Sequence, residues 1–159
     1  MRKLTFALGL ILILCSFGQG ETNLLRFFEG EWEGTVKEYE AGGKEIQKFK
    51  AIRILKPVHP DTMRGTFQYF GTNIESRPVP IEIIQKGNEF VLRQAGLAFS
   101  GTYKDKTFTF QGVDENQAKI WQSHFFLGGD LEYFTLEQQD FQTNRKFARI
   151  RGVLKLKKE

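Results

Sequence analysis

Short segments of alternating apolar and polar residues, separated by turn residues, recur along most of the chain. In the clearest one, Met63, Gly65, Phe67 and Tyr69 alternate with polar residues. Strict alternation is typical of a strand with one buried face, and turns at this spacing are typical of sandwiches and barrels. About nine or ten such segments follow one another, and no segment shows sustained helical periodicity.

Consecutive strands joined by short turns usually pair with each other. A meander of this length removes its exposed edges only by closing on itself. We therefore predict an all-β fold, a single up-and-down antiparallel β-barrel of 8–10 strands.

Residues 1–20 have the pattern of a secretory signal peptide. The basic residues Arg2 and Lys3 precede an unbroken apolar run, and the small residues Gly18 and Gly20 mark a cleavage site. The run is shorter than the ~20 residues that a membrane-spanning helix needs. We expect cleavage after Gly20 and a periplasmic or secreted mature protein.

The domain division predicted in this way is a signal peptide over 1–20 and one barrel domain over 21–159, without a stable membrane span. About 139 residues are enough for one domain with a sizeable core and too few for two. Two alternatives stay open at the N-terminus. One is a single membrane anchor, and the other is a lipoprotein acylated at Cys15, where Leu14 stands in place of the small residue of a lipobox.

The formal net charge of +4 falls to +2 when Arg2 and Lys3 are removed. This near-balance argues against a nucleic-acid partner, which normally requires a concentrated basic face. The expected partner is a small apolar molecule, and the sequence leaves the oligomeric state open.

A G-x-W-x-G motif at residues 30–34 opens the first predicted strand. With the strand count and chain length, it resembles the start of the lipocalin and fatty-acid-binding (calycin) group of barrels, which usually enclose a small apolar ligand. In that group the tryptophan closes one barrel end and packs against a basic residue of the last strand. The resemblance implies this role for Trp32, with Arg149 or Arg151 as its cation–π partner.

Seven aromatic residues are predicted to face inward, where they could line a ligand cavity or fill a core. They are Phe67, Tyr69, Phe99, Tyr103, Phe108, Phe110 and Tyr133. Gly65, Gly101 and Gly112 share faces with these rings and favour a cavity, because they leave room that a larger side chain would fill. The alternative is that the glycines mark bends in the strands.

His124 alternates with Ile120 and Phe126, which predicts that it faces inward. Haem-binding barrels such as nitrobindin use a single histidine as axial ligand, so His124 is the haem-ligand candidate of this chain. The alternative, which we favour, is a histidine held by an ordinary hydrogen bond. The histidines lack the spacing of a metal site, and we expect neither a metal nor a cofactor.

The sequence contains no G-x-S-x-G elbow and no glycine-rich phosphate loop. The leading interpretation is a non-enzymatic extracytoplasmic protein that binds a small apolar or amphipathic ligand inside the barrel. The alternatives are an interaction module with a filled core and, third, a lipocalin-like enzyme. A cavity of several hundred Å³ with a few polar groups would favour the first.

Overall fold

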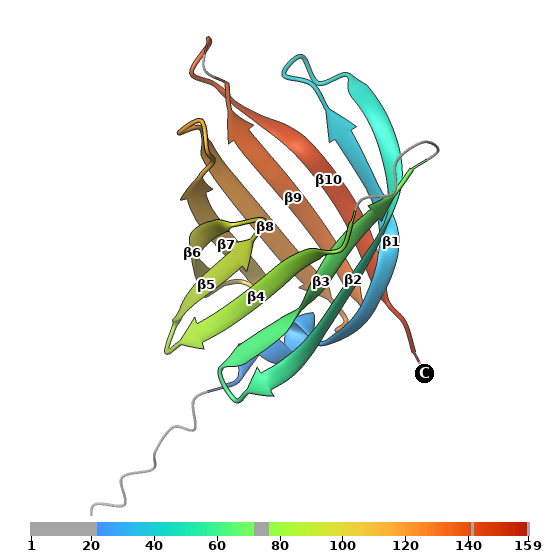
Figure 1. Ribbon diagram of the computed structural model, residues 1–159, viewed down its shortest axis with the longest axis vertical. Helices are drawn as coiled ribbons and strands as arrows, with labels where there is room; N and C mark the ends of the chain where they lie inside the picture. Colours follow the sequence, from blue (N-terminus) through green and yellow to red (C-terminus); the bar gives the residue numbers. More distant parts are fainter. Residues whose placement is uncertain (1–21, 72–76, 141, 159) are drawn as a thin grey trace, which may run out of the picture.

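A closed antiparallel barrel makes up nearly all of the computed structural model, which describes residues 22–71, 77–140 and 142–158. Figure 1 shows the strands wrapped around a common interior. The strands are β1 (Gly30–Tyr39), β2 (Glu45–His59), β3 (Thr62–Phe70), β4 (Val79–Lys86), β5 (Glu89–Gln94), β6 (Leu97–Lys104), β7 (Thr107–Val113), β8 (Lys119–Leu127), β9 (Leu131–Gln139) and β10 (Lys146–Leu156). Each strand pairs with its sequence neighbours, and β1 pairs with β10 to close the ring. The predicted fold class is confirmed, whereas the predicted signal peptide and Cys15 lie outside the described residues.

Alternation along each strand decides which side chains enter the barrel. On β8, the buried residues Ile120, Gln122, His124 and Phe126 alternate with partly exposed ones. The prediction that His124 faces inward is confirmed. Outward-facing residues form ion pairs between neighbouring strands, such as the contact from Lys50 to a glutamate on β1.

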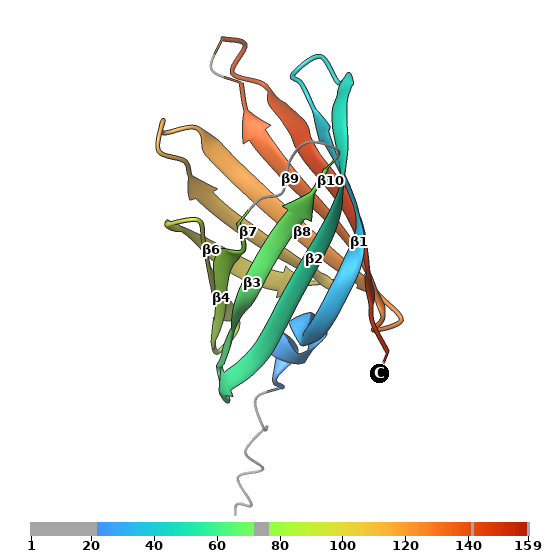
Figure 2. The same ribbon diagram turned by 45° about the vertical axis from the view of Figure 1, so that its right-hand side comes forward.

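One end of the barrel is closed by η1 (Leu24–Phe28), a single turn of 3-10 helix that precedes β1. Asn23 caps its start by accepting a hydrogen bond from a backbone N–H of the turn. The Phe28 ring is fully buried, and its centroid lies 4.7 Å from that of Phe108 and 4.9 Å from that of Phe126. Figure 2 shows η1 lying across the lower opening of the barrel, so that aromatic packing seals this end.

Trp32 lies at the closed end with only 1% of its surface exposed. Its indole N–H donates a hydrogen bond to the Glu29 carbonyl at 3.1 Å. The guanidinium carbon of Arg53 lies 5.3 Å from the centre of the Trp32 ring. A basic residue therefore does pack against the tryptophan, but it comes from β2 and not from the last strand.

The prediction that Arg149 or Arg151 contacts Trp32 is wrong, because neither residue is at an inward-facing position of β10 near the tryptophan. The β10 residue beside Trp32 is Leu156, which has the same inward parity as the other apolar residues of that strand. Arg151 alternates with those residues and faces outward. Arg149 lies at a β-bulge and contacts Glu38 and Gln138 at the other end of the barrel. Arg151 lies over the Tyr39 ring at 5.4 Å, far along the strand from the closed end.

The inward face of β9 is the opposite of the one predicted. Tyr133 is 44% exposed on the outer wall, whereas its neighbours Glu132 and Phe134 are buried. The aromatic residue faces solvent because a carboxylate occupies the interior position, where Arg53 provides its counter-charge. Tyr133 therefore does not line the barrel interior, contrary to the prediction.

The space beside two of the predicted cavity glycines is filled by aromatic rings. A Cβ built on Gly101 would lie 2.4 Å from the Phe110 ring, and one on Gly112 would lie 2.6 Å from the Phe99 ring. At Gly65 the added atom would lie 1.7 Å from a backbone oxygen of β2. These glycines permit rings or backbone to approach closely, so the room expected for a ligand is not found there.

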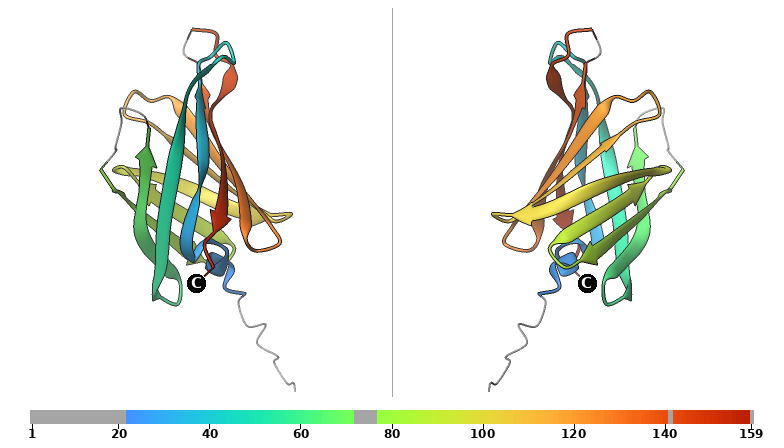
Figure 3. Two further views of the ribbon diagram at one scale, coloured as in Figure 1. Left: turned by 90° about the vertical axis from the view of Figure 1, so that its right-hand side faces the viewer. Right: turned by 90° about the vertical axis from the view of Figure 1, so that its left-hand side faces the viewer.

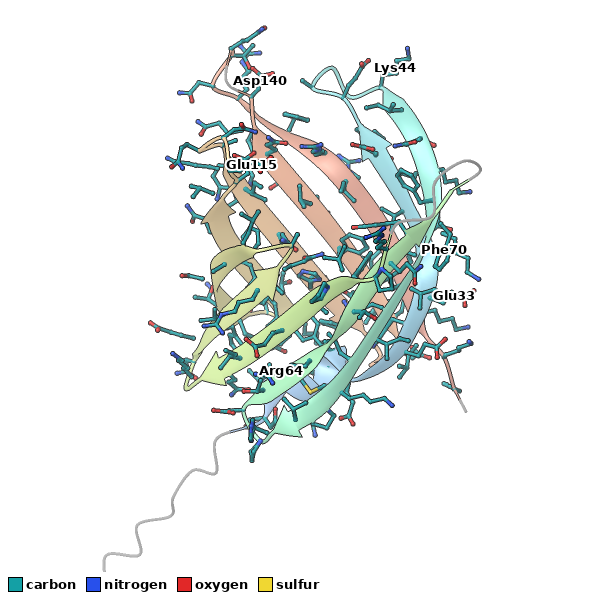
Figure 4. The ribbon with its side chains drawn as sticks, in the orientation of Figure 1. Glu33, Lys44, Arg64, Phe70, Glu115 and Asp140 are labelled. Atoms are coloured by element: carbon teal, nitrogen blue, oxygen red, sulfur yellow. The ribbon has the colours of Figure 1, made fainter. Side chains whose placement is uncertain are left out.

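The opposite end of the barrel is open and surrounded by hairpins. Figure 3 shows the β1–β2 and β9–β10 hairpins projecting beyond the other strands at this end. In Figure 4, Lys44, Glu115 and Asp140 mark the connections around the opening, and Glu33 and Arg64 point away from the barrel. A ligand approaching the interior from this end would not have to displace η1.

Candidate functional site

A cavity of about 330 Å³ occupies the open end of the barrel, and we call it the mouth. Its walls are apolar side chains from strands around the ring, and its rim is polar. The wall residues are Val36, Phe49, Tyr69, Ile120, Leu136 and Ile150; the rim residues are Glu38, Gln47, Gln138 and Arg149. This volume lies at the lower end of the range for small-molecule sites.

A much smaller interior space of about 30 Å³, here called the inner cavity, borders the mouth. The two spaces share Tyr69, Leu136 and Ile150 as lining residues. The polar residues that line the inner cavity but not the mouth are Arg53, Gln94, Gln122 and His124. Mostly apolar walls with a small number of polar groups are the general arrangement of a small-molecule site.

Three ionisable side chains form a buried cluster beside the inner cavity. The Arg53 guanidinium contacts both oxygens of the Glu132 carboxylate, with Nη1 2.8 Å from Oε1 and Nη2 2.5 Å from Oε2. His124 Nδ1 lies 2.7 Å from Oε1 of the same carboxylate. The side chains of Arg53 and Glu132 are 1% and 0% exposed. This Arg53–Glu132–His124 cluster joins β2, β8 and β9 across the barrel.

The cluster keeps Glu132 ionised. Burial by itself raises the pKa of the Glu132 carboxyl, but the charge of Arg53 and the hydrogen bond and charge of His124 lower that pKa to about 2. A carboxylate can only accept hydrogen bonds, so His124 Nδ1 must be the donor in this contact. The tautomer or charge state of His124 therefore has its Nδ1 protonated.

Two nitrogens of the cluster have neither a hydrogen bond nor an ion-pair contact among the described residues. They are Nε of Arg53 and Nε2 of His124, and both are buried. Buried polar atoms are normally satisfied by protein or by bound groups, because leaving one unmet costs about 1–3 kcal/mol. The side chains of both residues line the inner cavity.

Tyr69 separates the mouth from the inner cavity. Burial, together with the nearby Glu38 carboxylate, raises the pKa of the Tyr69 hydroxyl to about 12. The hydroxyl therefore stays neutral across the physiological range and adds no negative charge to the interior.

The structure separates the predicted aromatic residues by their depth in the barrel. Phe67 and Tyr69 line the inner cavity. Phe99, Phe108 and Phe110 are buried in the packed core, and Tyr103 packs against that core with its ring 4.6 Å from Phe108. The closed half of the barrel is thus filled, and the open half contains the cavities.

The space around His124 does not fit a haem. The ring stacks on Phe134 with centroids 6.0 Å apart, and it meets Phe28 and Phe110 edge-on. The inner cavity beside it is far smaller than a tetrapyrrole. Within the described ranges, no group of three or more His, Cys, Asp or Glu side chains could hold a metal ion.

The sequence analysis did not identify two residues of the site, Arg53 and Glu132. Arg53 alternates with the buried residues Ala51 and Leu55, and Glu132 precedes the buried Phe134 by two positions. Parity on β2 could therefore have identified Arg53 as an inward-facing charge. No comparable pattern identifies the mouth residues. Alternation along a strand shows whether a side chain faces inward or outward, but not how deep it lies along the barrel axis.

A more open hollow of about 530 Å³ lies along β3–β6. It includes exposed side chains whose charges are already paired, since Arg64 and Arg93 both contact Glu82 at 2.6 and 2.8 Å. The inner cavity differs from it in being lined by two side chains with buried polar atoms that have no hydrogen-bond partner among the described residues. We therefore take the interior spaces as the candidate site.

No protein-family model matches the chain, and no curated protein matches it by sequence. Solved structures do match the fold. The S-type phycobiliprotein lyase CPES from Guillardia theta has a TM-score of 0.67 at 12% identity, with 88% of this chain and 96% of that chain covered. Rv2717c from M. tuberculosis has a TM-score of 0.62 at 13% identity, with 84% and 95% covered.

A protein of unknown function from the DUF3598 family of Nostoc punctiforme also matches, with a TM-score of 0.65 at 9% identity. The match covers 84% of this chain and 49% of that chain. At these identities the likeness shows the fold alone. This chain has a closed antiparallel barrel of the lipocalin-like type, and among the described residues no helix has the length and apolar character to cross a membrane.

Proposed function

We propose that this protein binds a small amphipathic molecule in the open half of its barrel. The observation that carries the proposal is the apolar mouth of about 330 Å³, which borders an inner cavity lined by buried polar side chains. An apolar wall favours the tail of a ligand through the hydrophobic effect. The inner polar groups would fix its orientation. The proposed role is binding and not catalysis.

The location that we propose is outside the cytoplasm. It rests on the basic, apolar and small-residue order of residues 1–20. N-terminal sequencing of the protein from its native source should begin near Glu21. An intact Met1 on protein recovered from the cytoplasm would contradict this location, and a lipidated Cys15 would replace secretion with membrane anchoring.

A second candidate is an interaction module that uses the outer wall. Phe125, Tyr133 and Val153 lie directly opposite one another on β8, β9 and β10 and form an apolar row. Tyr133 and Val153 are 44% and 42% exposed. This candidate requires no ligand in the barrel, so it is the one favoured if the mouth binds nothing.

Filling the mouth tests the binding proposal. Ile150 lines both cavities, and Ile150→Trp should weaken binding of the neutral fluorescent probe N-phenyl-1-naphthylamine by at least about tenfold, because the indole takes up ligand space. Fluorescence titration measures the change.

The matched control for this titration is Val153→Trp, which adds the same ring on the outer face of the same strand. It should leave the affinity for the probe unchanged. Absence of saturable probe binding to the unaltered protein, or equal weakening by the two substitutions, would refute binding in the mouth.

A further inference from the structure

Three cations lie side by side on the outer wall of the barrel, on β2, β1 and β10, and we call them the basic strip. Lys37 of β1 is directly opposite Lys48 on one neighbouring strand and directly opposite Arg151 on the other. Like charges in directly opposed positions of a sheet destabilise it. Lys37 contacts the Glu45 carboxylate, whereas among the described residues no carboxylate forms an ion pair with Lys48 or Arg151. The strip therefore keeps two unpaired positive charges on one face of the molecule.

Apolar side chains cover the adjoining outer wall, which β8, β9 and β10 form side by side (Figure 2). They lie in two cross-strand rows and are here called the outer patch: Phe125, Tyr133 and Val153 in one row, Leu127 and Leu131 in the next. Leu127, Tyr133 and Val153 are 47%, 44% and 42% exposed. Contiguous exposed apolar patches with a polar rim mark sites that bind proteins or membranes.

A surface hollow of about 440 Å³ joins the basic strip to the outer patch. All three cations of the strip line it, together with Tyr133 and Val153 of the patch and the hydroxyls of Thr35 and Thr135. No carboxylate is among its described lining residues. Ammonium and guanidinium groups can only donate hydrogen bonds. The hollow therefore suits an anionic group that accepts several hydrogen bonds, as a phosphate does.

We propose that this wall is a docking surface for an anionic lipid membrane. The phosphate of a phospholipid would occupy the hollow against the basic strip, and the outer patch would contact the acyl chains beside it. The barrel would lie on the membrane surface with this wall toward the lipid. The inference goes beyond ligand binding in the mouth and does not depend on it.

The closed ring of strands favours lipid over an extended protein segment as the partner. Every strand of the described barrel is paired on both sides, so a partner strand finds no free edge to join. Recognition therefore depends on side chains, and those of this wall are typical of membrane interfaces. Tyr133 combines an apolar ring with a polar tip, and the cations combine apolar stems with charged ends. The negative surface potential of an anionic leaflet attracts such cations.

Sedimentation of the protein with large unilamellar vesicles tests the docking. Vesicles of phosphatidylglycerol and phosphatidylcholine in equal parts should bind the protein at least about tenfold more tightly than phosphatidylcholine alone. Binding should weaken as the salt concentration rises from about 0.05 M to about 0.5 M, because salt screens the attraction. The protein and all its variants carry the N-terminus found in the native source, so any lipid contact by residues 1–20 is common to them.

Lys48→Glu is the informative variant, since it reverses one unpaired charge of the basic strip. The new carboxylate would lie opposite Lys37 on the outer face, where it disturbs no packed side chain. It should weaken binding to the phosphatidylglycerol vesicles about tenfold. Binding of N-phenyl-1-naphthylamine in the mouth, measured without lipid, should not change. The matched control is Lys86→Glu, the same substitution at an exposed lysine at the end of β4, and it should weaken vesicle binding far less.

Tryptophan fluorescence locates the contact on the barrel. Val153→Trp adds an indole to the outer patch, and Val91→Trp adds one at an outward position of β5, on the opposite side of the ring. Phosphatidylglycerol vesicles should shift the emission of Val153→Trp to shorter wavelength, because lipid replaces water around the ring. The emission of Val91→Trp should shift less, since the natural tryptophans contribute the same background to both variants.

The outcomes separate this inference from the proposed function. Equal binding to the two kinds of vesicle, or equal weakening by Lys48→Glu and Lys86→Glu, would overturn the docking surface. Binding to poly-L-glutamate without binding to vesicles would also overturn it, and would assign the wall to an acidic protein partner. The naphthylamine titration without lipid tests the mouth separately, so either proposal can fail alone. Should Lys48→Glu not fold, the two tryptophan variants decide, and equal shifts in both would refute docking through this wall.

Discussion

Replacing Glu132 by glutamine should lower the free energy of unfolding by about 3–5 kcal/mol, because it leaves the Arg53 charge buried without a counter-ion. The amide keeps the size of the side chain, so the loss reports charge and not volume. Equilibrium unfolding in urea at pH 7 measures the difference.

The control for this prediction removes both charges. Arg53→Met combined with Glu132→Leu replaces the pair by apolar side chains of similar size, and substitutions of this kind are often close to neutral. The double variant should therefore be more stable than Glu132→Gln alone. If it is the less stable of the two, packing around the cluster matters more than charge pairing.

The pH dependence of the same variants tests the direction of the charge effect. The folded-state pKa of Glu132, about 2, lies below the usual value of 4.5 for a glutamate, so the carboxylate contributes stability above about pH 4.5. This stability is lost as the pH falls toward 2. A pKa shift of this size corresponds to a contribution of roughly 3 kcal/mol to the free energy of unfolding. The stability difference between the natural protein and Glu132→Gln should therefore narrow across this window. A constant difference would contradict an ionised Glu132.

Trp32→Ala should lower the free energy of unfolding by about 3–5 kcal/mol. The indole packs edge-on against Phe126 at 5.6 Å and lies beside Arg53, so its removal leaves a cavity at the sealed end of the barrel. Urea unfolding followed by circular dichroism measures the loss, because the intrinsic fluorescence changes with the substitution.

Trp121→Ala is the matched control. Trp121 is on the outer face of β8, where Lys146 lies 4.6 Å from its ring. Its loss opens no interior cavity and should cost far less than that of Trp32. Equal losses at the two tryptophans would show that Trp32 does not have the proposed packing role.

Period-two alternation was enough to predict the barrel because almost every strand has one buried face. Trp32 and Val36 are buried on one face of β1, as their spacing predicts. Alternation failed on β9, where Tyr133 was predicted to face the interior and lies on the outer wall. A glutamate faces inward there because its partner is Arg53, 79 positions away in the sequence, and no local pattern reports such a contact.

The sequence also did not indicate how deep each inward-facing residue lies along the barrel axis. Phe108 and Tyr69 both face inward, but one lies in the sealed aromatic core and the other at the cavity. Their heights depend on the stagger of neighbouring strands and on η1, which seals one end by tertiary contacts. The sequence therefore indicated which residues face the interior, and three of them, Phe67, Tyr69 and His124, line the inner cavity. It did not indicate where the filled half of the barrel ends and the hollow half begins.

The pairing of β1 with β10 has a consequence for the order of assembly. The register that joins Trp32 to Leu156 connects residues from opposite ends of the domain, so this contact has the largest loop to close. Contacts of such high sequence separation are slow to form. Until the last strand arrives, β1 and β9 each present an unpaired edge of the kind that promotes association between chains. The chain is therefore most exposed to aggregation in the interval before its two ends meet.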